Sequence, residues 1–287
     1  MRAAAGGHAG ALERIADIHV PFVVEIRFGR RSDRPDRAWI EEPERSRGPA
    51  HPRDAARRVT RQAGPMTQSR PAIEVRPYAT EDRSALVALF GAAGAGAPSS
   101  ELWGHEAALA DVYLTPYLDL EPASVFVALV EGRPAGYLAG CVDEARFPSE
   151  ADRTRAAIRR HRLYLRPRPV WFFARERYDV LRSALFREPV ADELADPRWP
   201  AHLHIDLVPQ ARGSGAGRAL MAAWFGRLEE VGVTGCYLQT TAENAGAVAF
   251  FERMGFVRHG PNPVVPGLRY GGRRLHQQTM VRPGPAG

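Results

Sequence analysis

The chain has 287 residues, 45% of them hydrophobic and 25% charged, which is the balance of a globular protein with a packed core. No stretch of about 18 apolar residues is present, which excludes a transmembrane helix, and the absence of lysine excludes P-loop and Schiff-base chemistry. The net charge of +6 is concentrated in residues 1–65 and 146–198, without a zinc-finger or RNA-recognition motif, so nucleic-acid binding is not expected.

Residues 1–65 are predicted to be an extension outside the core. Their stretches rich in Arg, Pro, Asp and Glu cannot bury much apolar area, although the patch His19–Phe28 could form a short strand or docking segment. Met66 directly precedes the ordered pattern and offers an alternative translational start. The first ten residues lack the apolar block of a secretory signal, and Cys141 and Cys236 are far apart. Both features favour a cytoplasmic protein with reduced thiols.

The domain over residues 66–287 is predicted to begin with a strand, two helices and a β-hairpin. Alternating or continuous apolar residues indicate the strands, and leucine and phenylalanine at helical spacing indicate the helices. Glu131-Gly132-Arg133-Pro134 supplies the turn of the hairpin. In chain order these elements are the strand Ile73–Tyr78, the helices Arg83–Phe90 and Glu101–Tyr117, and the hairpin strands Ser124–Val130 and Ala135–Val142.

An arginine-rich insertion follows at about residues 146–198, where 13 arginines stand against 8 acidic residues. It is expected to contain two helices, over about 150–163 and 174–186, separated by the proline-containing stretch Leu165–Pro169. Its aromatic residues are expected to pack the insertion onto the domain rather than to bind a ligand. These residues are Trp171, Phe172, Phe173 and Tyr178.

After the insertion, strands and helices alternate. A hairpin that precedes a strand–turn–helix–strand–helix unit indicates the α/β class. In chain order the sequence predicts a strand over Ala201–Val208, a glycine-rich turn over Arg212–Gly217, a helix over Arg218–Val231, a strand over Cys236–Thr240, a helix over Glu243–Met254 and a final strand at about 275–281.

The glycine-rich turn is a candidate anion site. Glycines at this point allow backbone N–H groups to converge, and the N-terminus of the next helix adds positive potential, so the turn can hold a pyrophosphate group. A dinucleotide-binding fingerprint would need a third glycine where Leu220 stands, which weakens that interpretation. A glycine-rich helix entry without any ligand stays the alternative.

Two motifs resemble one known superfamily. Pro209 to Gly217 is similar to the acyl-CoA loop of the GNAT superfamily of N-acyltransferases, R/Q-x-x-G-x-G/A. The start R-P-Y-A-T-E-D and the hairpin F-V-A-L-V-E-G-R-P-A-G-Y fit the superfamily as well, so the resemblance covers about residues 66–145 and 199–260. The second motif, N-x-x-A-x-x-F-Y-E-K-x-G-F, is matched by Asn244, Ala247, Phe250, Phe251, Glu252, Arg253, Gly255 and Phe256.

A finer resemblance is to the acetyltransferase-like C-terminal domain of eukaryotic O-GlcNAc hydrolases. It rests on the stretch from Tyr113 to Pro122, on the long insertion, and on the run from His202 to Leu207. That attached domain lacks an intact CoA loop, whereas this chain has one.

The superfamily resemblance implies a fold and a cofactor site. The fold is a central mixed, mostly antiparallel sheet with splayed central strands and helices on both faces. Acetyl-CoA would lie between the strands 201–208 and 235–240, with its pantetheine arm along exposed backbone whose N–H could also hold the developing oxyanion. The loop would take the pyrophosphate. The residues so implied are Leu207 and Val208 for the pantetheine backbone contacts, Arg212, Gly213, Ser214, Gly215, Ala216, Gly217 and Arg218 for the pyrophosphate, Asn244 for the pantetheine amide, and Val248 and Phe251 for the lining of the arm.

Such a transferase also needs a base for the acceptor ammonium. His202, His204 and Asp206 alternate on one strand and would share one face, and Asp206 and His204 are the candidate bases. A structural network with the arginine-rich insertion is the alternative, and a metal site from the three residues is not expected. A bulge, which the resemblance suggests, would turn Asp206 elsewhere. Weaker candidates for the base are Tyr113, Tyr137, Glu243 and His105.

The sequence therefore predicts an acetyl-CoA-dependent N-acetyltransferase with an amine acceptor of unknown identity and no metal. Phe251 stands where relatives often place a tyrosine acid, which leaves the acid role in doubt, although a thiol with a pKa of about 8.5 can leave unaided. This substitution slightly favours the alternative, an acetyl-CoA-binding sensor or partner-binding module with little or no turnover. No membrane partner is expected, and a homodimer stays open.

Overall fold

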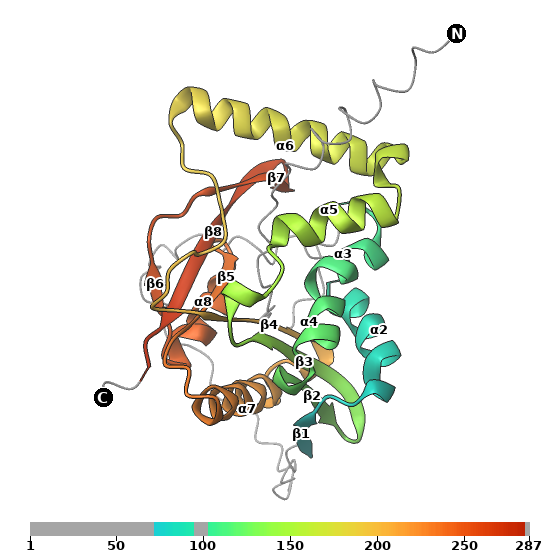
Figure 1. The fold of residues 1–287 in the computed structure, drawn as a ribbon, viewed down its shortest axis with the longest axis vertical. Helices are drawn as coiled ribbons and strands as arrows, with labels where there is room; N and C mark the ends of the chain where they lie inside the picture. Colours follow the sequence, from blue (N-terminus) through green and yellow to red (C-terminus); the bar gives the residue numbers. More distant parts are fainter. Residues whose placement is uncertain (1–71, 95–102, 285–287) are drawn as a thin grey trace, which may run out of the picture.

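The computed structural model describes residues 72–94 and 103–284. The predicted extension, with His19–Phe28, and Met66 lie outside these residues. The described chain folds around one eight-stranded sheet in the order β1-β2-β3-β4-β5-β8-β6, with β7 paired to β8 beside this path (Figure 1). The strands are β1 (Ile73–Pro77), β2 (Val125–Val130), β3 (Arg133–Cys141), β4 (Ala201–Leu207), β5 (Cys236–Thr241), β6 (Val257–His259), β7 (Val264–Tyr270) and β8 (Arg273–Arg282).

The sheet separates at its centre. Its pairings are antiparallel except for that between β4 and β5, which is parallel. β4 pairs with β3, and β5 pairs with β8, along their lengths. β4 and β5, in contrast, are in register only at Ala201/Cys236 and His202/Tyr237, and beyond these pairs the two strands are no longer paired. The predicted mixed, mostly antiparallel sheet with splayed central strands is confirmed.

Helices cover both faces of the sheet, as predicted. One face carries α2, α3, α4 and α5, the other carries α7 and α8, and α6 lies outermost beside β7 (Figure 1). No helix in the described part of the chain is long and apolar enough to cross a membrane. The helices are α2 (Arg83–Gly94), α3 (Glu106–Tyr113), α4 (Thr115–Leu120), α5 (Glu150–Arg160), α6 (Pro167–Phe186), α7 (Ala216–Glu230) and α8 (Ala245–Arg253).

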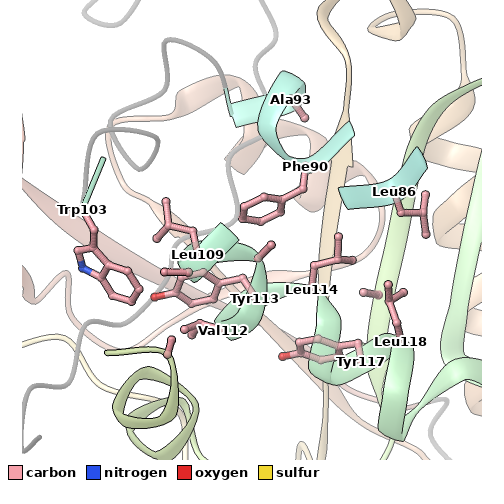
Figure 2. Packing of buried hydrophobic residues seen from close by; sticks show 14 of the residues in the cluster. Leu86, Phe90, Ala93, Trp103, Leu109, Val112, Tyr113, Leu114, Tyr117 and Leu118 are labelled. Carbon is pink, nitrogen blue, oxygen red and sulfur yellow. The ribbon is translucent and has the colours of Figure 1, made fainter. Parts of the chain in front are cut away.

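Each face of the sheet has its own apolar core. Figure 2 shows part of the first, where Phe90 of α2 and Tyr113 of α3 lie among buried leucines. Because side chains alternate across a strand, neighbouring residues of β2 belong to different cores. Val127 packs in the first core, whereas Phe126 packs in the second, with α7 and α8.

The predicted helix over Glu101–Tyr117 is two helices, with a break at Leu114. Pro116 explains the break, because it lacks the N–H that would bond the carbonyl of Val112 in a continuous helix. That carbonyl instead accepts a hydrogen bond from Nη1 of Arg153, at 2.6 Å. The break therefore gives the insertion a point of attachment.

The insertion differs from its prediction in two ways. α6 begins at Pro167, earlier than predicted, because the first turn of a helix makes no use of N–H donors and tolerates proline. Phe172 and Phe173 are buried, as predicted, but Trp171 and Tyr178 are exposed.

The C-terminal part holds three strands, β6, β7 and β8, where one was predicted. Pro266-Gly267 lies inside β7, and the pairing of β7 with β8 shifts between Val264 and Arg269. A proline followed by glycine is typical of a loop, so the sequence pattern concealed this strand.

Gly140 of β3 marks a close approach between the sheet and α7. A Cβ at this position would lie 2.2 Å from Cζ3 of the fully buried Trp224. Gly140→Ala is expected to lower the free energy of unfolding by about 1–3 kcal/mol, because the indole must shift in a packed core. Gly226→Ala, in α7, is the matched control: nothing lies within 4 Å of its added Cβ. Urea unfolding measures both variants, and wild-type stability of Gly140→Ala would contradict the close approach.

Candidate active site

β4 carries its polar residues on one face, as predicted. His202, His204 and Asp206 face the side of the sheet that α3, α4 and α5 cover, and the apolar residues that alternate with them pack under α7 and α8. The pairing with β3 runs from His202 to Leu207 without a shift. The bulge that the resemblance suggested is therefore absent from this stretch, and the predicted alternation holds.

Asp206 is a buried carboxyl near the end of β4. It is 8% exposed, and its Oδ2 accepts a hydrogen bond of 2.5 Å from the hydroxyl of Tyr137 on β3. Burial raises the pKa of Asp206 to about 6, against the opposing effects of the Tyr137 hydroxyl and the positive charge of Arg212. A carboxyl so placed is ionised at neutral pH but holds a proton more tightly than an exposed aspartate.

The two histidines belong to a different group of contacts. The hydroxyl of Tyr117, on α4, lies 2.7 Å from Nε2 of His202 and 2.9 Å from Nε2 of His204. Nδ1 of His202 contacts the carboxylate of Glu144. Arg153 of α5 approaches the same Tyr117 hydroxyl at 3.4 Å. The histidines thus connect β4 to α4 and to the arginine-rich insertion.

His204 is poorly suited to hold a proton. Burial lowers its pKa well below the usual value, and the nearby His202 and Arg153 lower it further. The imidazole is therefore neutral at neutral pH. The contacts of both histidines are those that the structural-network interpretation expects. The role of Asp206 as a base stays a prediction.

The sequence did not predict three members of this network: Tyr117, Glu144 and Arg153. The four-residue spacing of Tyr113 and Tyr117 was the available signal, because residues four apart share a helix face. No local sequence pattern indicates Glu144, which stands just before the insertion, or Arg153, which lies within it.

The weaker candidates for the base have structural contacts of their own. The hydroxyl of Tyr113 donates to Glu150 at 2.9 Å, and Tyr137 donates to Asp206 as described above. Glu243 lies 2.8 Å from Nδ1 of His276 on β8. His105 caps the N-terminus of α3, where its Nδ1 accepts a backbone hydrogen bond of 3.2 Å. Of these residues, the structure brings only Tyr137 to Asp206.

The backbone N–H and C=O groups at the end of β4 point to two different sides of the strand, toward β3 or toward β5. The N–H of Val208 donates to the carbonyl of Ala135 at 2.9 Å, and its carbonyl accepts from the N–H of Ala211 at 3.0 Å. Val208 therefore does not expose its backbone, contrary to prediction. Because bonding directions alternate along an antiparallel pair, the backbone groups of Ile205 and Leu207 point toward β5, where the strands have separated. An exposed N–H on this edge of β4 that could hold the oxyanion stays a prediction.

The glycine-rich turn adopts a conformation that needs its glycines. Gly213 and Gly215 have φ of +76° and +108°, in a region that other residues rarely adopt, and Gly215 is the N-cap of α7. The hydroxyl of Ser214 tightens the turn by accepting from the N–H of Ala216 at 3.2 Å. The first N–H groups of a helix have no partner within it, so the turn fits an anionic group such as pyrophosphate.

The two arginines that flank the turn differ in position. Nη2 of Arg212 donates to the carbonyl of Leu207 at 3.2 Å, so this side chain turns back toward β4 and Asp206. Arg218, in the first turn of α7, is exposed. Of the two, Arg218 is the exposed one, and the contact of either arginine with a phosphate stays a prediction.

The remaining predicted cofactor residues belong to α8. Asn244 caps this helix, since its Oδ1 accepts from the N–H of Ala247 at 3.1 Å. Val248 is buried in the core beside α7, and Phe251 is fully buried with its ring 5.9 Å from that of Phe256. These are structural positions, and the contacts of Asn244, Val248 and Phe251 with a pantetheine arm stay predictions.

A metal centre does not emerge from the part of the chain that the structure describes. No group of three or more His, Cys, Asp or Glu side chains in that part is arranged to hold an ion. His202, His204 and Asp206, which share a strand face, bond to tyrosine hydroxyls instead.

Comparison with known sequences gives one family and partial relatives among the curated proteins. The model of the acetyltransferase (GNAT) family matches residues 95–256. A mycothiol acetyltransferase of Pseudarthrobacter chlorophenolicus is 39% identical over 54 residues, which are 19% of this chain and 17% of that protein. The chain thus matches about a sixth of the length of its curated relatives.

Solved structures are similar to this chain at low sequence identity, and two of them serve as examples. A ribosomal-protein-alanine N-acetyltransferase from Brucella melitensis is 20% identical, with a TM-score of 0.46 over 73% of this chain and 99% of that chain. The structure of yncA from Salmonella typhimurium with acetyl-CoA is 13% identical, with a TM-score of 0.43 over 74% of this chain and 94% of that chain. Because the family model covers more than half of the sequence, including both motifs, the chain belongs to the acetyltransferase (GNAT) family.

Proposed function

We propose that the chain is an acetyl-CoA-dependent N-acetyltransferase in which Asp206 takes the proton of the acceptor amine. Acetyl-CoA is the usual co-substrate of the family. The observation that carries the role of Asp206 is a buried carboxyl with a raised pKa, located where β4 separates from β5. Strongly perturbed carboxyls near an opening are candidates for acid–base chemistry.

In this proposal, backbone groups as well as charged side chains hold the acetyl-CoA. The turn from Gly213 to Gly217 and the N-terminus of α7 receive the pyrophosphate, with Arg218 at the solvent side. The backbone of Ile205 and Leu207, which points toward β5, pairs with the pantetheine arm. An N–H from the same strand edge stabilises negative charge on the thioester oxygen.

Asp206 acts on the acceptor side of this opening. An ammonium with a pKa near ~10 must lose a proton before its nitrogen can attack. The raised pKa of about 6 makes Asp206 a stronger base than an exposed aspartate, and it is ionised above that pH. Tyr137 positions the carboxylate through its hydroxyl. His202 and His204 hold the surrounding elements in place.

The pH dependence of activity tests this arrangement. Asp206 must be ionised to accept a proton, so kcat/KM is expected to fall as the pH drops through about 6. The Tyr137 hydroxyl lowers the pKa of Asp206, so Tyr137→Phe should move this acid limb upward by about one pH unit. Tyr113→Phe, which removes a hydroxyl bonded to Glu150, should leave the limb in place. If the fall of kcat/KM at acid pH stays at the wild-type pH in Tyr137→Phe, Asp206 is not the group that causes it.

The activity itself is tested by release of free CoA thiol. Acetyl-CoA is incubated with the chain and a panel of amines that includes amino acids, polyamines and peptides with free N-termini. Thiol release that depends on both the chain and an amine is the expected result. The same assay leaves room to find the acceptor, which the described residues do not identify.

The second candidate is an acetyl-CoA-binding module with little or no turnover. Phe251 favours it, because phenylalanine carries no proton for the departing thiolate and its ring is fully buried. Calorimetric binding of acetyl-CoA without amine-dependent thiol release would support this module and exclude the enzyme.

Other expectations stay predictions. The resemblance to the domain of O-GlcNAc hydrolases rests on the sequence patterns around Tyr113, the insertion and His202 alone. A cytoplasmic location, the lack of a metal and the possible homodimer likewise rest on the sequence.

A further inference from the structure

α6 has two opposite faces, of which one packs against the domain. Its buried face meets β7 and the turn Leu163–Leu165. The opposite face is also apolar, but it points to solvent. The residues of the buried face are Pro169, Phe172, Phe173, Glu176, Asp179 and Ser183.

The exposed face carries a continuous stripe of large apolar side chains. Trp171, Tyr178, Leu181 and Leu185 are 74%, 64%, 65% and 77% exposed. Their spacing of three, four and seven residues keeps them, with the small exposed Ala174, within an arc of roughly 80° on the helix. These five residues are called the outer stripe. Large apolar side chains gathered in this way mark a contact surface.

Arginines border the outer stripe, and one of them, Arg182, is paired with Glu188 just beyond the end of α6 at 3.1 Å. Arg177 lies along one side, and Arg168, Arg175 and Arg182 lie along the other. Both acidic residues of α6, Glu176 and Asp179, are buried on the opposite face. The surface that α6 offers to solvent is therefore apolar and rich in arginine, and Glu188, which pairs with both Arg182 and Arg274, lies beside its C-terminal end.

We propose that the outer stripe docks α6 onto an anionic lipid surface. A helix with leucine and aromatic residues on one face and arginines at its borders is suited to lie in the plane of a membrane interface. The indole of Trp171 and the phenol of Tyr178 are the side chains that favour this boundary. Among the labelled elements of Figure 1, α6 lies outermost and runs along one edge of the described part of the molecule.

Charge argues against a second copy of the chain as the occupant. Two paired α6 helices would place arginine borders against arginine borders, and like charges at such flanking positions disfavour pairing. Anionic headgroups complement the same borders. The prediction of no membrane partner relied on the lack of a transmembrane segment, which a helix lying in the interface does not need. This inference goes beyond the proposed acetyl transfer and does not depend on it.

Vesicle flotation with the full chain tests the proposal. Vesicles of phosphatidylcholine with roughly 30% phosphatidylglycerol are compared with vesicles of phosphatidylcholine alone. Binding to the anionic vesicles is expected to be at least about tenfold tighter and to weaken as salt is raised, because arginine attraction to headgroups is screened. Equal binding to both vesicles, or none to either, would overturn the proposal.

Matched variants distinguish binding through the outer stripe from nonspecific hydrophobic binding. The triple variant Trp171→Ser, Leu181→Ser, Leu185→Ser should lose anionic-vesicle binding about tenfold or more and keep its melting temperature, since these side chains are exposed. Leu120→Ser and Val257→Ser, which remove apolar side chains 56% and 54% exposed elsewhere, should bind as wild type does. Full vesicle binding by the triple variant would refute the assignment. A wild-type dimer in sedimentation that the triple variant abolishes would identify a second copy as the occupant instead.

Discussion

Asp206→Asn is expected to lower turnover on the best amine about a hundredfold, with acetyl-CoA affinity within about threefold of wild type. Asparagine keeps the shape of the side chain, and its oxygen can still accept the hydrogen bond from Tyr137. It cannot take a proton at neutral pH, and a positioned base typically contributes on the order of 10²–10⁴ in rate. Steady-state kinetics with thiol detection, together with calorimetry of acetyl-CoA binding, measure the two quantities separately.

His204→Gln is the comparison that identifies the base. The environment of His204 keeps its imidazole neutral, so an acid limb near pH 6 belongs to Asp206 rather than to this histidine. His204→Gln should therefore retain most of the turnover. Full activity in Asp206→Asn with a collapse in His204→Gln would transfer the role to the histidine. Full activity in both variants would mean that water, or the ionisation of the substrate itself, removes the proton from the amine.

A stability measurement distinguishes a lost base from a damaged fold. The folded-state pKa of Asp206 is raised above its unfolded value, so ionising this group costs stability as the pH rises from about 4 to above 6. Asp206→Asn removes that cost and should melt at a higher temperature than wild type at pH 8. At pH values below about 4 the difference should disappear, since the wild-type carboxyl is then protonated in both states. Lower turnover combined with a higher melting temperature at pH 8 would fit a base and not a disrupted core.

Gly215→Val is expected to weaken acetyl-CoA binding at least about tenfold. The φ of +108° at Gly215 is strained for a β-branched residue, so the turn must change shape at the start of α7. A steric clash is not the cause of the expected loss of affinity, because the nearest atom to an added Cβ is Cδ1 of Ile73, at 3.5 Å. Calorimetry with acetyl-CoA measures the loss, and unchanged affinity would contradict the proposed pyrophosphate site.

Gly232→Val supplies the control for backbone strain. Gly232 follows α7, has a φ of +70° and has no atom within 4 Å of an added Cβ. Valine there should destabilise the fold by a similar amount but leave the affinity for acetyl-CoA unchanged. If both variants lost affinity equally, general destabilisation rather than the turn would explain the result.

The features that local sequence could predict lie mainly in β4 and the turn after it. The alternation of His202, His204 and Asp206 places them on one face, because the side-chain period of a strand is two. Gly213 and Gly215 marked the left-handed turn, because few other residues adopt that conformation. Proline accounts for two wrong helix boundaries. Pro116 divides a helix that was predicted to be continuous, and Pro167 begins a helix whose predicted start is later in the chain.

The contacts of the three polar residues of β4 could be seen only in the tertiary structure. Tyr117, from α4, bonds both histidines, and Tyr137, from the neighbouring strand, bonds Asp206. Burial then moves the two relevant pKa values apart, upward for Asp206 and downward for His204, since removal from water disfavours the charged form of each.

By itself, the sequence determined the class of fold, the glycine-rich turn and the shared face of β4, because each depends on the period or conformation of a few adjacent residues. The tertiary structure decided which backbone groups face the opening, which polar residue can hold a proton, and which side of α6 remains exposed. These properties depend on partners distant in the chain, such as Ala135 for Val208 and β7 for α6. Packing brings such partners together, and local periodicity carries no record of them.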